Sequence, residues 1–142
     1  MKTLEVTAAI IRQSGKILIC QCPADKNCGL LWEFPGGKIE SGETGEQCIV
    51  RECQEELGVT LSVERELTDI TSEYHDCIVH LHFYLCKIVA GIPDKKEHNA
   101  LAWITADEIE QYEFCLADKE MLLKTSNLSE VISLKQRSYD DS

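Results

Sequence analysis

The chain has 142 residues, of which 44% are hydrophobic and 27% are charged, a composition typical of one folded globular domain. Its formal net charge of −11 argues against a nucleic-acid polymer as a partner, because such binding requires a basic surface. A single nucleotide remains compatible with this charge, since divalent cations held by acidic side chains can present positive charge to phosphates.

The first residues give no sign of export. Arg12 and Gln13 interrupt the apolar run, and no small-residue cleavage site follows it. No stretch approaches the roughly 20 apolar residues that a membrane-spanning helix needs. We therefore expect a cytoplasmic protein without a membrane partner, formed by one domain over residues 1–142 and present as a monomer or a homodimer.

The eight cysteines could indicate either disulfides or a zinc site. Cys20 and Cys22 have the spacing C-x-C instead of C-x-x-C, and the other cysteines form no paired ligand cluster. A domain with an adequate core and no signal peptide does not need disulfides. We interpret most of these residues as reduced cysteines that act as small hydrophobic side chains.

The N-terminal part of the sequence has the pattern of a β-hairpin. Residues 5–11 and 16–22 have the composition of strands, and Gly15 supplies a turn between them. A polar loop over residues 23–29 and a short apolar segment over residues 30–34 follow, and the chain is expected to bend at residues 35–37, Pro-Gly-Gly.

Residues 44–57 have a helical pattern with signals at both ends. Thr44 is followed three residues later by Gln47, as in a capping box, and Gly58 provides the C-terminal stop. The remaining predicted elements are strands over residues 59–70, 77–89 and 101–104, helices over residues 105–112 and 117–134, and a frayed tail over residues 138–142. This order predicts the α/β (α+β) class, with a mixed sheet and helices on both of its faces.

Three carboxylates share one face of the predicted central helix. Successive residues of a helix turn by about 100°, so Glu52, Glu55 and Glu56 project within one arc. Such like charges need either solvent or a cation, and Mg²⁺ prefers carboxylate ligands beside a substrate phosphate. A solvated acidic face and a metal site both fit this helix taken alone.

The surrounding residues favour the metal site. Residues 37–59 resemble the Nudix box, in the form Gly37-x5-Glu43-x7-Arg51-Glu52-Cys53-x-Glu55-Glu56-x-Gly58-Val59. The preceding run, Leu-Trp-Glu-Phe-Pro-Gly-Gly-Lys over residues 31–38, resembles the segment that leads into the box in MutT-type and CTP-pyrophosphohydrolase-type members. The resemblance implies the Nudix fold, a mixed sheet sandwiched between helices.

The resemblance also implies a Mg²⁺ site, with Mn²⁺ as a substitute. The implied metal ligands are the carbonyl of Gly36 and the carboxylates of Glu52, Glu55, Glu56 and Glu97. Glu52 is our first choice of general base and Glu97 our second, although Glu97 alone could be an ordinary exposed loop residue. Arg51 is expected to orient the box by pairing with a carboxylate such as Glu43. Lys38 is placed to neutralise phosphate, and its other interpretation is an exposed turn lysine.

The base of a nucleotide requires an apolar slot and a few polar groups. The resemblance implies Leu4, Val6 and Phe34 for the slot, although Phe34 could equally be a core residue. Asp118 is the implied base-reading residue: an ionised carboxylate would accept from the exocyclic amine of cytosine, and a protonated one could donate to an oxidised purine. A structural Asp118 at a helix N-terminus is the alternative.

Three positions complicate the choice of substrate. Cys22 and Cys77 stand where similar family members carry arginines that contact phosphate or base, and Tyr74 points faintly toward dinucleoside-polyphosphate hydrolases. The predicted function is a Mg²⁺-dependent nucleoside triphosphate pyrophosphohydrolase that acts on CTP, dCTP or modified nucleotides in nucleotide-pool sanitation. The alternatives are an 8-oxo-dGTP diphosphatase and a non-catalytic nucleotide sensor, which would be expected to have a damaged box.

Overall fold

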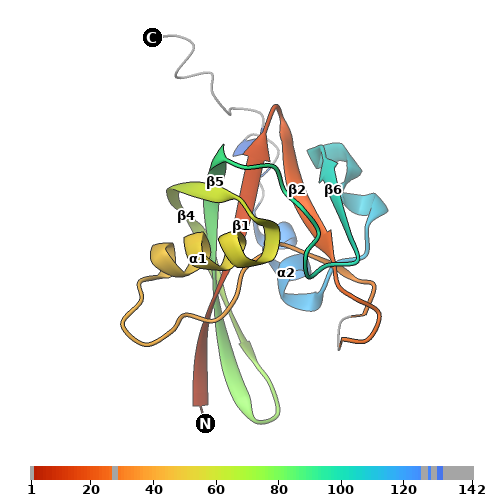
Figure 1. The fold of residues 1–142 in the computed structure, drawn as a ribbon. Coiled ribbons are helices and arrows are strands. Elements are labelled where there is room, and N and C mark those ends of the chain that lie inside the picture. Colours follow the sequence, from red (N-terminus) through yellow and green to blue (C-terminus); the bar gives the residue numbers. More distant parts are fainter. Residues whose placement is uncertain (1, 27–28, 126–127, 129–130, 133–142) are drawn as a thin grey trace.

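The computed structural model describes residues 2–26, 29–125, 128 and 131–132 (Figure 1). The elements in chain order are β1 (Lys2–Gln13), β2 (Lys16–Gln21), β3 (Trp32–Glu33), α1 (Gly45–Leu57), β4 (Thr60–Glu73), β5 (Cys77–Ala90), β6 (Ala100–Ile104), the 3₁₀ helix η1 (Ala106–Gln111) and α2 (Leu116–Lys124).

Strands β1 and β2 form the predicted hairpin. Gln13 pairs with Lys16, and both residues of the turn, Ser14 and Gly15, have positive φ angles of 54° and 79°. Two such residues match the right-handed twist of a tight antiparallel hairpin.

The strands form one mixed sheet in the order β3-β2-β1-β5-β4, and β6 also pairs with β2. Strands β1 and β5 are parallel, whereas the other pairings are antiparallel. Helix α1 lies in front of this sheet in Figure 1 and α2 lies behind it. The predicted mixed sheet between helices is confirmed.

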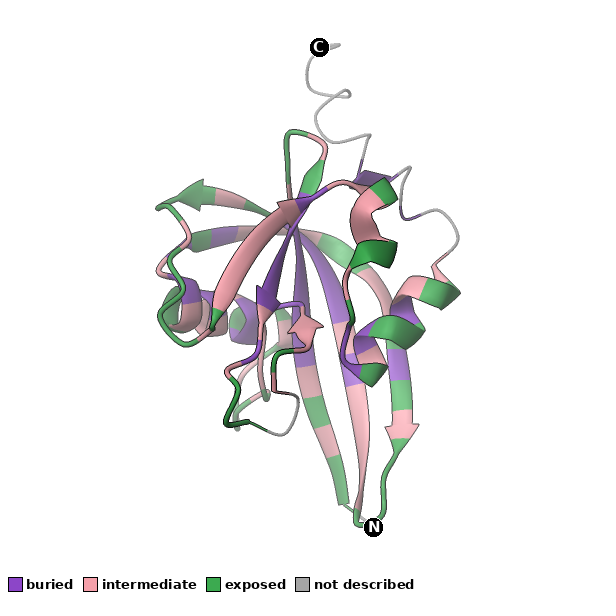
Figure 2. Ribbon diagram, turned by 90° about the vertical axis from the view of Figure 1, so that its right-hand side faces the viewer, coloured by how far each residue is buried: buried purple, intermediate pink, exposed green. Residues whose placement is uncertain are grey.

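Side chains of β1 alternate between two hydrophobic cores. Ala8 and Ile10 belong to the core that includes Met121 of α2, whereas Ala9 and Ile11 belong to the core beneath α1. A strand buried on both faces is typical of the centre of a sheet covered by helices. Figure 2 shows this buried centre, and it also shows that β1, β4 and β5 extend beyond the helices toward the N-terminus, where buried residues give way to exposed ones.

The chain from Pro35 to Ile39 runs along the edge of β1, which the sequence did not predict. Backbone N–H groups of Ala9 and Thr7 donate to the carbonyls of Pro35 and Gly37, both at 2.8 Å, and Ile39 donates to Glu5 at 2.9 Å. The chain thus pairs first with β2, through the short strand β3, and then with β1, through the residues that follow. The glycine turn is therefore held by β1 along its length.

The prediction of one long final helix over residues 117–134 is wrong. Helix α2 ends at Lys124, and Thr125 has non-helical angles of φ −93° and ψ 89°. Thr125 is followed in the sequence by Ser126 and Asn127, and all three residue types have poor helix propensity. The helix expected over residues 105–112 is present as the 3₁₀ helix η1. Residues 27–28 of the expected loop, Leu134 and the expected tail over residues 138–142 lie outside the described residues.

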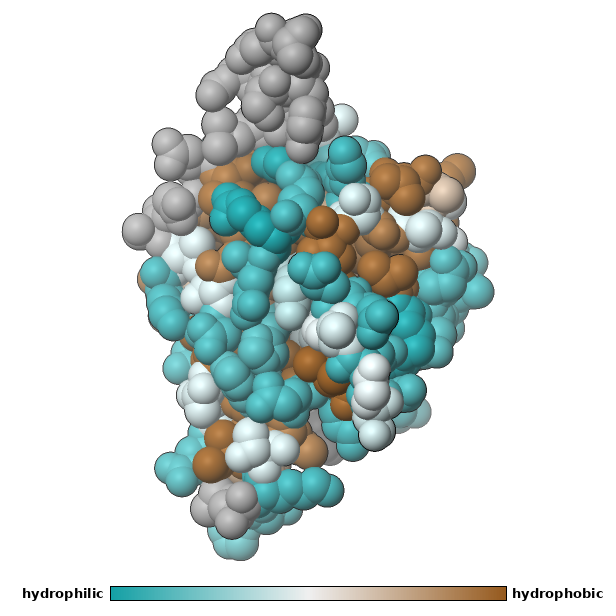
Figure 3. All heavy atoms as spheres, turned by 90° about the vertical axis from the view of Figure 1, so that its left-hand side faces the viewer, coloured by the Kyte–Doolittle hydropathy of each residue, from teal (hydrophilic) through white to brown (hydrophobic). Residues whose placement is uncertain are grey.

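Within the described part of the chain, no helix has the length and apolar character needed to cross a membrane. Figure 3 shows the left-hand side of Figure 1, where hydrophilic side chains cover most of the surface and hydrophobic ones form separate patches. No disulfide joins any of the seven described cysteines, and all of these except Cys77 are buried.

Candidate metal and nucleotide site

Helix α1 begins and ends with the predicted signals. The backbone N–H of Gln47 donates to Thr44 Oγ1 at 3.1 Å, and the backbone N–H of Thr44 donates to Gln47 Oε1 at 3.0 Å. Gly58 has a left-handed φ of 74°, and its N–H donates to the carbonyl of Gln54. The buried side of the helix docks on the sheet through Cys48, Ile49, Cys53 and Leu57. The opposite side therefore presents the box carboxylates.

Arg51 lies at the centre of these carboxylates. Its guanidinium makes a two-point ion pair with Glu43, and its Nη1 donates to Glu52 Oε2 at 3.1 Å and to Glu55 Oε1 at 3.4 Å. Its Nη2 also donates to the carbonyl of Lys38 at 3.2 Å. The expected ion pair between Arg51 and Glu43 is thus present, and it ties the helix to the glycine turn.

The same contacts shift the pKa values of the pair. Hydrogen bonds from the Arg51 guanidinium lower the pKa of Glu43 to about 2, and the bonds to Glu43 raise the pKa of Arg51. Glu40 lies 3.7 Å from Arg51 Nη1, a partner that the sequence did not predict. Both charges of the central pair therefore persist across the physiological pH range.

Glu56 is the inner carboxyl of the helix face. Burial is the largest cause that raises its pKa to about 9, and the hydrogen bond and negative charge of Glu52 add to the shift, as do the charges of Glu33 and Glu97. A buried group surrounded by carboxylates keeps a proton unless a cation replaces it. The donor set, made of carboxylate oxygens, fits a hard divalent cation.

Two glycines give the turn its close approach to neighbouring groups. A Cβ atom at Gly37 would lie 2.3 Å from the carboxyl carbon of Glu52, so any other residue at this position would displace the Glu52 side chain. A Cβ atom at Gly36 would lie 2.0 Å from the carbonyl oxygen of Thr7 in β1. Gly36 is thus needed for the turn to pair with the sheet.

An open pocket of about 360 Å³ lies beside Glu56. Its lining residues are Cys22, Pro23, Lys26, Glu33, Glu56, Glu97 and His98. The pocket brings together Glu56 of α1 and the exposed Glu97 of the distant segment before β6, two residues expected to share a metal. It also contains Cys22, one of the two cysteines at the expected arginine positions.

His98 is a member of this pocket that sequence reasoning missed. Its side chain is only 5% exposed, and its Nε2 lies 3.2 Å from Glu33 Oε2 and 3.8 Å from Glu56 Oε1. Its Nδ1 is buried without a hydrogen-bond partner among the described residues. The one available signal was its position directly after Glu97.

The predicted base-binding residues lie on β1, on α2 and directly after β3. Leu4 and Val6 are half-buried on β1, and Val6 packs against the α2-side core. Phe34 is 4% exposed and stacks on Phe114 with ring centroids 5.6 Å apart, so it is a core residue in this structure. Asp118 is 6% exposed in the first turn of α2.

The surroundings of the Asp118 carboxyl raise its pKa and so favour its neutral form. Burial raises its pKa well above the ordinary range, and the negative charge of Glu33 raises it further, whereas a hydrogen bond with the backbone of Phe34 lowers it. A neutral carboxyl offers one donor and one acceptor.

Lys38, Cys77 and Tyr74 lie outside the pocket lining. Lys38 is exposed, and its backbone forms a bridge with Val6 of β1. Cys77 starts β5, and Tyr74 is 42% exposed in the turn that joins β4 to β5. The structure thus brings Glu56 of the box and Glu97 together at the pocket, but leaves Cys77 and Tyr74 at the far end of the sheet.

Comparison with known proteins matches this arrangement. Residues 6–124 match the family model described as NUDIX domain. The chain belongs to the Nudix family. It is a Nudix hydrolase, and the resemblance of residues 31–59 to MutT-type and CTP-pyrophosphohydrolase-type sequences is confirmed by its relatives. Nudix hydrolases generally use divalent metal ions.

Two Escherichia coli (strain K12) relatives cover most of the chain. A CTP pyrophosphohydrolase is 41% identical over 122 residues, which are 86% of this chain and 90% of that protein. An 8-oxo-dGTP diphosphatase is 35% identical over 129 residues, which are 90% of this chain and 100% of that protein. The solution structure of the E. coli ORF135 protein matches with a TM-score of 0.76 and 40% identity, covering 86% of this chain and 87% of that one.

A more distant solved structure shares the fold alone. The crystal structure of a MutT NUDIX hydrolase from Burkholderia pseudomallei has a TM-score of 0.78 at 24% identity and covers 89% of this Nudix hydrolase and 100% of its own chain.

The raised pKa of Glu56 predicts that divalent-cation binding by this Nudix hydrolase releases a proton. The metal-free folded protein favours protonated Glu56. The contribution of this group to the free energy of unfolding is therefore complete below pH 4.5 and is lost as the pH rises through about 9. The melting temperature of the metal-free wild type should therefore fall more steeply from pH 6 to pH 9 than that of Glu56→Gln, and Mg²⁺ affinity should rise by up to about tenfold per pH unit. Calorimetry can measure both, with exposed Glu46→Gln as the matched control. Equal slopes in wild type and Glu56→Gln would contradict the prediction.

Proposed function

We propose that this Nudix hydrolase is a Mg²⁺-dependent nucleoside triphosphate pyrophosphohydrolase that releases a nucleoside monophosphate and pyrophosphate, with cytosine or modified nucleotides as substrates in nucleotide-pool sanitation. The observation that supports it most is the meeting of Glu56, on the box helix, with Glu97 at one pocket, beside the Glu52 carboxylate that Arg51 holds. Mn²⁺ is the proposed substitute metal. In this proposal the enzyme binds a free nucleotide and no nucleic-acid polymer.

The proposed metal ligands are the Gly36 carbonyl and the carboxylates of Glu52, Glu55, Glu56 and Glu97. When bound there, Mg²⁺ neutralises phosphoryl oxygens and lowers the pKa of a coordinated water. Glu52 is the proposed general base. Its carboxylate accepts from Arg51, shares a hydrogen bond with Glu56 and lies against Gly37, so its position in the site is fixed.

Arg51 and Glu43 are proposed to hold Glu52 in place instead of reacting themselves. The two-point ion pair fixes the guanidinium, and the guanidinium fixes Glu52 and Glu55. Lys38, exposed directly after the glycine turn, is proposed to neutralise substrate phosphate. Glu97 is the second candidate for the base, since its exposed carboxylate reaches the same pocket.

The preference for cytosine is proposed from the chemistry of Asp118. A neutral carboxyl can donate to N3 of cytosine while its carbonyl accepts from the exocyclic amine, which gives two complementary hydrogen bonds. Leu4 and Val6, on the sheet face toward α2, are the proposed apolar contacts, and Phe34 supports them from the core. The 41% identical relative is named CTP pyrophosphohydrolase, which favours the same choice.

The second candidate substrate is 8-oxo-dGTP, because the relative named 8-oxo-dGTP diphosphatase is aligned over its whole length. Pyrophosphate release should be measured with Mg²⁺ for CTP, dCTP, 5-methyl-dCTP, dGTP and 8-oxo-dGTP. For ADP-ribose and a dinucleoside polyphosphate, which are other Nudix substrates that release no pyrophosphate, the nucleotide products should be measured by chromatography. We expect the highest kcat/KM for a cytosine nucleotide. A higher value for 8-oxo-dGTP would replace the cytosine proposal, and tight binding without turnover would identify a sensor.

Two substitutions at Asp118 test how the base is recognised. Asparagine resembles the neutral carboxyl, so Asp118→Asn should keep the ratio of kcat/KM for CTP over 8-oxo-dGTP within about threefold. Asp118→Leu should lower that ratio about 10- to 100-fold, because each lost hydrogen bond to a buried group costs about 1–2 kcal/mol. Because both kcat/KM values are measured on the same variant, a general loss of folded protein cancels from their ratio. Equal losses in both variants would mean that an ionised Asp118 is required, and no loss in either would remove Asp118 from base recognition.

A further inference from the structure

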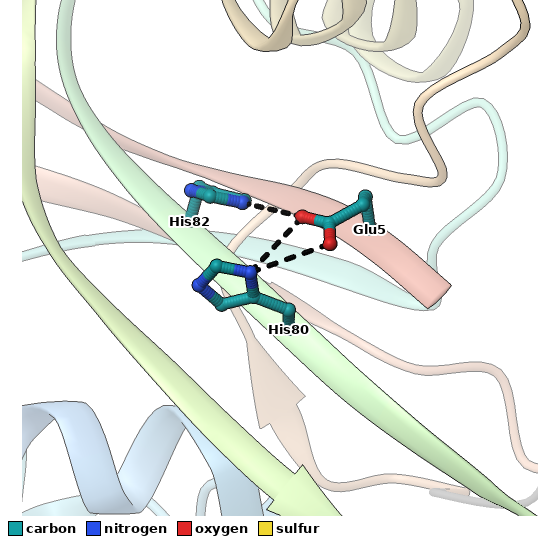
Figure 4. Close-up of side chains that lie close together, drawn as sticks. All are labelled: Glu5, His80 and His82. Atoms are coloured by element: carbon teal, nitrogen blue, oxygen red, sulfur yellow. Dashed lines mark hydrogen bonds and ion pairs between the residues drawn. The ribbon is translucent and has the colours of Figure 1, made fainter. Parts of the chain in front are cut away.

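Two histidines and a glutamate converge on the neighbouring strands β1 and β5 (Figure 4). Glu5 Oε1, on β1, lies 2.8 Å from His82 Nε2 and 3.1 Å from His80 Nδ1, both on the neighbouring strand β5. The imidazole centroids are 4.1 Å apart. Each ring therefore directs one nitrogen toward the same carboxylate.

The other nitrogen of each ring contacts a second carboxylate from β4. His80 Nε2 lies 2.6 Å from Asp69 Oδ2, and His82 Nδ1 lies 2.9 Å from Glu66 Oε2. A carboxylate behind an imidazole fixes the tautomer and the orientation of the ring, and this pair is a recurrent feature of protein metal sites. Here the arrangement occurs twice, so that with each ring protonated on the nitrogen that faces β4, the two inner nitrogens would offer lone pairs to an ion held beside Glu5.

The spacing of the three inner atoms suits one metal ion. The carboxylate oxygen of Glu5 and the two inner nitrogens all lie within 4.8 Å of one another. Ligand atoms about 2.0–2.1 Å from a tetrahedral ion stand about 3.3 Å apart, close to the two distances from Glu5. Small side-chain rotations would bring the three atoms to coordinating distance.

We propose that Glu5, His80 and His82 bind a divalent transition-metal ion of the Zn²⁺ type, through the carboxylate, His80 Nδ1 and His82 Nε2. Two imidazoles favour Zn²⁺ over Mg²⁺, in contrast to the all-carboxylate set on α1. The side chains of His80, His82 and Glu5 are 28%, 18% and 46% exposed, so the remaining coordination positions are open to water.

The bound ion would join the neighbouring strands β1 and β5 of the sheet. Glu5 lies on β1, the histidines lie on β5, and their carboxylate partners lie on β4. The carbonyl of Glu5 also accepts from the N–H of Ile39, at the end of the glycine turn. The site is a structural clip for this end of the sheet, separate from the proposed reaction and independent of its substrate.

Zinc titration of the full chain tests the proposal. The protein is first treated with chelator and then titrated in millimolar Mg²⁺, which occupies the carboxylate site on α1. We expect one Zn²⁺ site that raises the melting temperature, and an affinity at least about 100-fold weaker in His80→Ala/His82→Ala. Asp69→Asn should weaken binding about 10- to 100-fold, because it removes a carboxylate behind a ligand. His75→Ala, which removes an exposed imidazole from the same hairpin, is the matched control and should bind like wild type.

Two spectroscopic measurements on the wild type keep the test independent of variant folding. With Zn²⁺ bound, nitrogen NMR should find His80 protonated on Nε2 and His82 on Nδ1, opposite tautomers set by the geometry. With Co²⁺, visible bands without thiolate charge transfer should appear, which separates this site from the other set of possible ligands, Cys22, Glu33 and Cys115. Unchanged tautomers on adding Zn²⁺, or equal affinity in the double variant and His75→Ala, would overturn the proposal in favour of a proton-held network. Neither result would alter the pyrophosphate-release assay on which the proposed function depends.

Discussion

Glu52→Gln is expected to reduce Mg²⁺-dependent pyrophosphate release by about 10³-fold or more. The substitution removes a proposed metal ligand and the proposed general base together, and loss of a base alone costs about 10²- to 10⁴-fold. The amide retains an oxygen that can accept from Arg51, so the helix face should keep its geometry. Turnover should be measured at saturating Mg²⁺ with the best nucleotide of the substrate panel.

The matched control for this variant is Glu46→Gln. Glu46 is exposed in the first turn of the same helix, so Glu46→Gln makes the same chemical change outside the carboxylate face. It should keep nearly full activity. Near-normal turnover in Glu52→Gln would remove Glu52 from the mechanism and leave Glu97 as the candidate base.

Gly36→Ala is expected to cost about 3 kcal/mol of folding free energy, or roughly 10 °C in melting temperature. The new Cβ would lie 2.0 Å from the Thr7 carbonyl oxygen, which is a backbone atom that cannot move without disturbing β1. Displacing the turn would also shift the Lys38 carbonyl that Arg51 binds, so activity should fall with stability.

Gly42→Ala is a control that separates the close approach from backbone conformation. Gly42 has a left-handed φ of 82°, but a Cβ there would meet nothing within 4 Å. Its cost should be limited to about 1 kcal/mol of conformational strain. If thermal unfolding shows equal losses for Gly36→Ala and Gly42→Ala, contact with β1 is not the reason for the glycine.

Helix α1 could be predicted from the sequence because its determinants are local. Thr44, Gln47 and Gly58 lie within a few residues of the groups they cap, and the three carboxylates follow from helical periodicity alone. The hairpin at Gly15 was predictable for the same reason. Where residues close together in the sequence determine the local conformation, the prediction agrees with the structure.

Elements that depend on distant neighbours could not be predicted in this way. The pairing of residues 35–39 with β1 joins chain segments that are separated by about thirty residues, as in the bond of Thr7 Oγ1 to the Gly37 carbonyl. The break at Thr125 has another cause: the poor helix propensity of Thr125, Ser126 and Asn127 is a local signal that the apolar periodicity of residues 117–134 outweighed. Helical periodicity therefore predicted one helix where the chain forms more than one segment.

The residues of the candidate site fall into the same two groups, those with local determinants and those that depend on distant parts of the chain. The box residues and the Arg51–Glu43 pair were found from their spacing, whereas His98 and Glu40 were found only once the chain was folded. Periodicity indicated that Glu56 shares a face with its neighbours, but burial beside Glu33 and Glu97 gives it the high pKa. Likewise, His80 and His82 showed only the alternation of a strand until β1 and β4 supplied their partners.

The sheet keeps the carboxylate helix α1 on one face and Asp118 of α2 on the other, with β1 buried between them. With Asp118 as the proposed base-reading residue, substitutions on α2 are expected to alter nucleotide choice while the proposed cleavage site beside α1 stays intact, and substitutions on α1 are expected to leave nucleotide choice unchanged. The two relatives named for different nucleotides are what such separable evolution would produce, and directed mutagenesis of α2 is the direct route to a new specificity.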